Sequence, residues 1–127
     1  MQYGYKKEIN LSFFEAEKKA REELIKAGFG IITEINAKET FKKKLDVEFE
    51  NYVILGACHA ASAHKVLQID KEIGLLLPCN VIVFQDGEKV FVSAILPSVA
   101  MSMVDKPELA PIAKEVEDNL KKVVDSI

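Results

Sequence analysis

Arginine and tryptophan are the scarcest residues of this sequence. Tryptophan is missing, and among the 17 basic residues only Arg21 is an arginine. The planar guanidinium group is the usual side chain for bidentate recognition of phosphate and guanine. The 20 acidic residues also outnumber the basic ones, which gives a net charge of -3 at pH 7. Composition therefore gives no electrostatic support to nucleic-acid binding, and we expect no nucleic-acid partner.

Long apolar runs and a cysteine framework are also missing. The longest apolar stretch, residues 75–84, is too short to span a bilayer and contains Pro78 and Asn80. Residues 1–10 carry charges and no apolar stretch, so no signal peptide is expected. Cys58 and Cys79 are too few for a disulfide framework. We therefore expect a cytoplasmic protein with reduced thiols and no membrane partner.

The common catalytic and metal-binding motifs are missing as well. The sequence has no G-x-S-x-G, no P-loop and no G-x-G-x-x-G. Cys58 with His59 or His64, and Cys79, is a conceivable set of metal ligands, but no recognised spacing such as C-x-x-C is present. His59 and His64 are five residues apart and do not share one face of a helix. We predict no metal site, and no cofactor is indicated.

What the sequence does contain is typical of one globular domain spanning residues 1–127. Hydrophobic residues make up 49% of the chain and charged residues 29%. A chain of this length buries roughly two thirds of its unfolded surface, which is enough for a core without disulfides or metal. Hydrophobic periodicity predicts strands at 2–9, 29–35, 52–57, 81–85 and 88–95, and helices at 12–28, 36–45, 59–73 and 105–127.

Local signals define most of these boundaries. Three of the predicted helices begin with a capping box, in the pairs Ser12 and Glu15, Asn36 and Glu39, and Asp105 and Glu108. The short second helix is expected to bury Phe41 and Leu45. Strands and helices mix along the chain, and the hairpin makes part of the sheet antiparallel. We therefore predict an α+β two-layer sandwich, with a mainly antiparallel sheet and helices on one face.

The hairpin of the last two strands predicts a partner. With Asp86-Gly87 as a type I′ turn, Val83 faces Val90 and Val81 faces Val92. This register also puts Cys79, opposite Ala94, on the apolar face. The opposite face is not polar either: it carries Ile82, Phe84, Phe91 and Ile95, diluted by Asn80, Lys89 and Ser93. Such a face needs a cover. We favour a homodimer that packs sheet against sheet over the alternative that the C-terminal helix of the same chain covers it.

The helix after Cys58 is the one predicted helix without a capping box. Its first N–H groups need an acceptor, and either a Cys58 thiolate or a bound anion would provide one. The alternative is a buried cysteine that packs as a small apolar residue, with water or a loop carbonyl at the helix end. His64 is expected beside Ala60 and Leu67 as a partly buried helix residue.

Two functional hypotheses follow from this segment. The first is a small ligand or anion bound near the start of this helix, with the ligand-binding candidates Cys58, His59, Ala60, Cys79 and Asn80. The alternative is a thiol-dependent enzyme, or a redox or metal-binding protein, that uses Cys58 and Cys79. In the thiol enzyme, Cys58 is the nucleophile, His59 a possible base and Cys79 a possible resolving partner. A protein-interaction module with neither a ligand nor a reactive thiol is a third interpretation.

Several segments together resemble domain-of-unknown-function family 302, a group of small bacterial and archaeal proteins. They are residues 28–35, 44–45, 55–58 and above all 73–81, which read Ile-Gly-Leu-Leu-Leu-Pro-Cys-Asn-Val. The resemblance implies an α+β fold likened to the TATA-binding-protein sandwich, and dimers, without an established activity. The family commonly has Asn-Pro after the first cysteine, where this chain has His59-Ala60, and Asp where this chain has Asn36.

Overall fold

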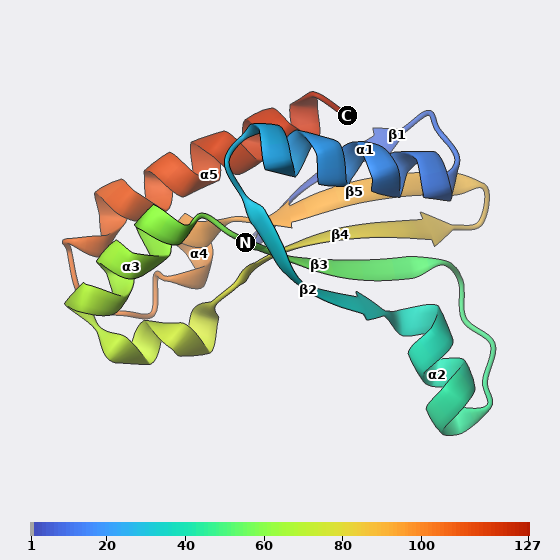
Figure 1. The fold of residues 1–127 in the computed structure, drawn as a ribbon, viewed down its shortest axis with the longest axis horizontal. Coiled ribbons are helices and arrows are strands. Elements are labelled where there is room, and N and C mark those ends of the chain that lie inside the picture. Colours follow the sequence, from blue (N-terminus) through green and yellow to red (C-terminus); the bar gives the residue numbers. More distant parts are fainter. Residues whose placement is uncertain (1) are drawn as a thin grey trace.

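The computed structural model describes residues 2–127 and contains one antiparallel sheet of five strands in the order β1-β5-β4-β3-β2 (Figure 1). The strands are β1 (Gly4–Ile9), β2 (Gly30–Asn36), β3 (Tyr52–Cys58), β4 (Cys79–Asp86) and β5 (Lys89–Ile95). The helices are α1 (Phe13–Lys26), α2 (Ala37–Leu45), α3 (Ala60–Ile69), α4 (Pro97–Ala100) and α5 (Leu109–Asp125), with a 3₁₀ helix at Lys71–Leu76. The predicted α+β sandwich is confirmed.

Helices α1 and α5 form the second layer, on one face of the sheet (Figure 1). Helix α1 begins with the predicted capping box, in which the Ser12 side chain accepts from the Glu15 amide. It ends before Gly28, whose φ of 88° is the left-handed conformation that favours glycine. Arg21 links this helix to the edge strand β2 through an ion pair with Glu34. The buried apolar residues of α1 are spaced three and four apart, so they lie on one face of the helix, and this face packs against the sheet.

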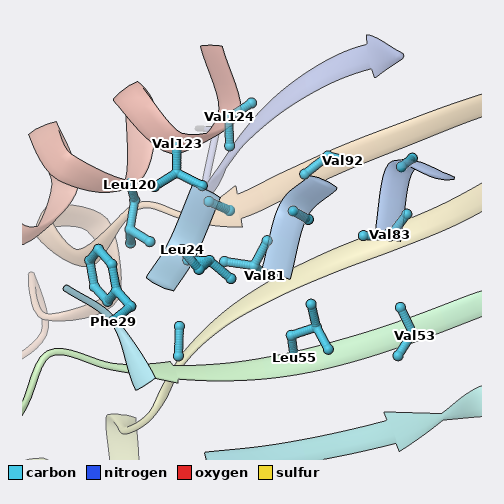
Figure 2. Close-up of a cluster of buried hydrophobic side chains, with 14 of the residues drawn as sticks. Leu24, Phe29, Val53, Leu55, Val81, Val83, Val92, Leu120, Val123 and Val124 are labelled. Carbon is cyan, nitrogen blue, oxygen red and sulfur yellow. The ribbon is translucent and has the colours of Figure 1, made fainter. Parts of the chain in front are cut away.

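The hydrophobic core lies between these two layers. Figure 2 shows Leu24 of α1 and Leu120 of α5 among the inward side chains of β3, β4 and β5. The strand residues that are almost fully buried there are Val53, Leu55, Ala57, Val81, Val83, Val92 and Ala94. Alternate residues of each strand supply this face, because successive side chains of a strand point to opposite sides.

The β4–β5 hairpin has a different register from the one predicted. Asp86 pairs with Lys89, so the two-residue turn is Gly87-Glu88, and Val83 faces Val92 instead of Val90. Gly87 has a φ of 62°, whereas Glu88 is not in the left-handed region. This pattern is typical of a type II′ turn, which needs glycine only at its first central position. Because the shift is an even number of residues, the predicted faces are unchanged.

Two helix predictions are also corrected. The predicted helix 59–73 is divided at Asp70, whose extended backbone ends α3 and whose side chain caps the following 3₁₀ helix. The predicted capping box of Asp105 and Glu108 does not form. Glu108 itself has helical backbone angles, and no side chain caps α5 among the described residues. Pro97 begins the short helix α4, which the sequence analysis did not predict.

The outer face of the sheet, turned away from α1 and α5, is apolar as predicted. The half-buried side chains of Ile54, Ile82, Phe84 and Phe91 lie at its centre. Helix α5 packs into the same core as α1, so the alternative that the C-terminal helix covers the outer face is wrong. None of the helices in residues 2–127 has the length and apolar character needed to cross a membrane.

Candidate functional site

The pairing of β3 with β4 brings the two cysteines to the same end of the sheet. Cys58 is the last residue of β3, Cys79 is the first residue of β4, and Ala57 pairs directly with Cys79. The preceding Gly56 leaves room for this junction, because a Cβ there would lie 2.8 Å from Cγ of Pro78 and 1.9 Å from Oγ1 of Thr33. The two cysteines are therefore neighbours.

Both cysteines line one cavity, hereafter the Cys58–Cys79 cavity. Its polar lining consists of Cys58, His59, Ser62 and Cys79. The apolar lining comes from four parts of the chain: Ala57, Ala63 and Val66; Leu77 and Pro78; Pro97 and Met101; and Ile112, Ala113 and Val116. The volume of the cavity that the centre of a water molecule can occupy is about 30 Å³. A single water needs about 10–15 Å³ on this measure, so the cavity has room for about two.

His59 forms the polar end of the cavity. Its Nδ1 atom lies 2.9 Å from Oγ of Ser62, and its ring packs edge-on against Phe29 with 5.7 Å between centroids. A Cβ at Gly28 would lie 3.6 Å from Cδ2 of His59, so the helix stop of α1 also borders this ring. The contacts with Ser62 and Phe29 hold the imidazole in place.

The start of α3 lies at the same end. His59 is the N-cap residue, and no side chain of residues 2–127 caps this helix. The predicted lack of a capping box is therefore confirmed. The amides of a first helical turn carry partial positive charge and favour an acceptor that approaches from the cavity.

The two thiols lie in different environments. Cys58 is half-buried, whereas Cys79 is buried. Burial raises the pKa of the Cys79 thiol to about 11, and the charge of a Cys58 thiolate contributes to this shift. Cys79 is consequently a protonated thiol at neutral pH, and a weak nucleophile.

The other predicted site residues lie outside the cavity lining. Ala60 is exposed at the start of α3, and Asn80 is exposed on the outer face of the sheet, beside a separate groove under Leu75. His64 is exposed, so the prediction of a partly buried His64 is wrong. In the described part of the chain, no group of three or more His, Cys, Asp or Glu side chains is arranged to hold a metal ion.

Ser62 and the α4–α5 side of the cavity were not predicted from the sequence. Ser62 is 8% exposed and follows His59 by three residues, a spacing that places both in the first turn of α3. Met101 and Ala113 come from segments remote in sequence, and no local pattern connects them with Cys58.

This arrangement defines a small α+β sandwich protein with an apolar cavity between the sheet end and its helical layer. The chain belongs to the DUF302 family, a domain of unknown function, which matches residues 5–127. No curated protein matches the sequence.

A solved structure shares this fold over nearly its full length. It is the crystal structure of an uncharacterized conserved DUF302 protein from Bacillus stearothermophilus, with a TM-score of 0.93 and 25% sequence identity. The similarity covers 99% of this chain and 98% of that one. Neither the family nor this structure is described with an activity.

Proposed function

We propose that this protein is a homodimer that binds a small ligand in the Cys58–Cys79 cavity. The observation that carries the proposal is the convergence of Cys58, His59 and Cys79 on one cavity at the uncapped start of α3. A concave site with an apolar lining and a few polar groups at one end is typical of small-molecule binding sites.

The lining favours a ligand with an apolar body and one polar end. Ten of its fourteen residues are apolar, and none is lysine or arginine. A multiply charged anion would find no counter-charge there, and its desolvation would be costly. A polar or singly charged end group would instead meet the imidazole of His59 and the hydroxyl of Ser62.

Dimerisation is supported by the outer face of the sheet. Phe84 stacks between Tyr52 and Phe91 on this face, with centroid distances of 5.6 Å and 5.2 Å. A contiguous apolar face of this kind is unusual on the surface of a monomer. A two-fold symmetric pair of sheets would remove it from water.

A matched pair of variants on α3 tests the ligand site. Ala63 lines the cavity, whereas Ala61 is exposed on the same helix. Ala63→Leu fills the cavity, and Ala61→Leu is the control. We expect xenon to shift the amide NMR signals of Val66 and Ala113 in the wild type and in Ala61→Leu, but not in Ala63→Leu. Equal shifts in all three proteins, or none in the wild type, would contradict the proposal.

The thiol-dependent enzyme is the second candidate. It is favoured by one observation: the half-buried Cys58 lies beside His59 and Cys79 at the uncapped start of α3. Cys79 would then act only as the resolving thiol, since its raised pKa makes it a poor first nucleophile.

Alkylation kinetics distinguish the two candidates. In the Cys79→Ser background, iodoacetamide reacts with Cys58 alone. An activated nucleophile reacts faster than free N-acetylcysteine at pH 7 and slows in His59→Ala. A rate no faster than that of the free thiol rejects the enzyme and leaves the ligand-binding proposal standing.

A further inference from the structure

The Cys58–Cys79 cavity is too small for the whole of the ligand proposed above. It lies at the end of the sheet where α3, α4 and the start of α5 gather (Figure 1). Its room for about two waters is the space of a polar end group and a carbon or two. A ligand with an apolar body must therefore extend beyond the cavity. Two grooves that share lining residues with the cavity are candidates for the rest of it.

The first candidate is the groove under Leu75, hereafter the Leu75 groove. It offers about 270 Å³ on the measure that gives about 30 Å³ for the cavity. Its lining consists of residues 75–80, Ile95, Pro97, Ala100 and Met101, none of which is charged. Half of them also line the cavity: Leu77, Pro78, Cys79, Pro97 and Met101. A single layer of residues therefore separates the two spaces.

The second candidate, hereafter the α4–α5 groove, is lined by ten residues between Ser98 and Ala113. It shares only Met101 and Ala113 with the cavity. Its lining includes Asp105 and Lys106. An aliphatic chain placed beside these two charged groups would remove water from them, which is costly. The uncharged Leu75 groove is therefore the better place for an apolar body.

Met101 is the one residue that lines all three spaces. It is the C-cap residue of α4 and is 8% exposed, in a cluster with Val66 and Leu109. The backbone of α4 is tied to α5, because the amide and the hydroxyl of Ser98 both donate to Oε1 of Glu117, at 3.1 Å and 2.6 Å. A methionine side chain is unbranched and has three rotatable bonds, so it can move while the backbone stays in place.

We propose that the Cys58–Cys79 cavity and the Leu75 groove form one binding site for an unbranched aliphatic chain with a small polar end, such as a primary alcohol. This inference rests on the ligand site proposed above. The hydroxyl lies beside His59 and Ser62, and the chain passes Met101 into the Leu75 groove. The space that a methionine side chain vacates has the width of an unbranched chain, so a cyclic body does not pass.

Amide NMR titrations with primary alcohols test the inference, and xenon is the probe of the cavity alone. In the wild type, we expect the dissociation constant to fall about fourfold for each methylene added from 1-butanol to 1-octanol, because each is removed from water. Cyclooctanol has as many carbons as 1-octanol but holds them in a ring. It should bind about tenfold more weakly or worse, since its methylenes remain outside the passage.

Two variants close the path at different points. Ala100 lines the Leu75 groove but not the cavity, so Ala100→Leu fills the groove alone. Met101→Ile keeps an apolar side chain of similar size that is stiff at its branched Cβ, so the partition no longer moves. We expect either change to weaken 1-octanol about tenfold or more, because fewer methylenes are buried. Ala110→Leu, in the α4–α5 groove, is the matched control and leaves the affinity for 1-octanol unchanged.

Xenon separates this inference from the cavity proposal. Circular dichroism checks that each variant folds, and all three should still bind xenon. If xenon binds but the wild type does not bind 1-octanol, or either closing variant binds it with wild-type affinity, the extended site is overturned and the cavity proposal stands. Where Met101→Ile loses xenon as well, Ala100→Leu alone decides. Weaker 1-octanol binding in Ala110→Leu would place the chain in the α4–α5 groove and also overturn the inference. A wild type that does not bind xenon would overturn both.

Discussion

The Nδ1 atom of His59 lies 2.9 Å from Oγ of Ser62, so the N-cap residue of α3 contacts a side chain of its own first turn instead of a backbone amide. The serine is 8% exposed, which makes it the one buried polar residue among residues 2–127. This contact fixes the imidazole at the cavity while the first amides of the helix remain without a side-chain acceptor. The site is therefore organised at a cost to the local stability of the helix.

Replacing His59 with asparagine should stabilise the fold. An asparagine N-cap accepts a hydrogen bond from the first turn, and we expect a gain of about 0.5–1 kcal/mol in the free energy of unfolding. Urea denaturation measures it. Ser12→Ala, which removes the cap of α1, is the reverse control and should cost about 1 kcal/mol. A loss of stability in His59→Asn would show that the contacts of the imidazole outweigh the missing cap.

Stability at alkaline pH should depend on Cys79. Its pKa of about 11 in the folded protein exceeds the ordinary thiol value of 9.0, mainly because of burial. Because the pKa of this thiol is higher in the folded protein, Cys79 of the unfolded chain loses its proton at a lower pH than Cys79 of the folded protein. The stabilisation is therefore fully present below pH 9.0 and is lost as the pH rises toward about 11. We expect wild type to lose about 2–3 kcal/mol more than Cys79→Ala over this range.

Paired denaturation curves from pH 8 to 11 measure this difference, since lysine and tyrosine titrations affect both proteins alike. Cys58→Ser keeps the buried thiol and removes only the smaller contribution of the Cys58 charge, so it should show most of the wild-type loss. Parallel curves for wild type and Cys79→Ala would show that the Cys79 thiol does not ionise in this range.

The junction of β3 with its neighbours should tolerate no side chain at Gly56. A Cβ there would meet Oγ1 of Thr33 at 1.9 Å, and we expect Gly56→Ala to cost about 1–3 kcal/mol. Gly74→Ala is the matched control, because its nearest neighbour, Leu67, would lie at an ordinary 3.9 Å. Adding Thr33→Ala should recover part of the loss in thermal unfolding. Equal effects of the two glycine substitutions would contradict the close approach.

Adjacent residues of β4 should respond differently to protein concentration. Val83 is fully buried in the core, and Val83→Ala should cost about 2 kcal/mol at every concentration. Phe84 points to the outer face. In a homodimer, the midpoint of thermal unfolding rises with protein concentration. This dependence should persist in Val83→Ala and disappear in Phe84→Ala. A wild-type midpoint that does not change with concentration would contradict dimerisation.

Local sequence signals predicted the elements well where the physical cause is itself local. The capping box at Ser12, the left-handed stop at Gly28 and the alternation in β4 and β5 depend on neighbours only a few residues away. The predicted hairpin register was wrong because an Asp-Gly dipeptide is compatible with two turns, a type I′ turn at Asp86-Gly87 and a type II′ turn at Gly87-Glu88. The extended backbone at Asp70, which divides one predicted helix, likewise has no strong local signal.

Part of the candidate site could also be predicted from the sequence. Cys58 and His59 were found because an uncapped helix start is visible in the residues that precede it. Their proximity to Cys79 depends on β3 and β4 being antiparallel neighbours, and the contribution of Met101 depends on how the α4 segment returns to the sheet. These are long-range contacts, which periodicity does not encode.

The sequence by itself determined the two apolar faces of the sheet, because alternation along a strand assigns each side chain to a face whatever the neighbouring strand is. Only the tertiary structure decided which face the helices cover, that both cysteines border one cavity, and that α2 leaves Leu45 exposed and Phe41 half-buried, contrary to the burial predicted for both. Those properties depend on where remote segments pack. The packing that buries the most apolar area is favoured, and this total area cannot be read from any short window of sequence.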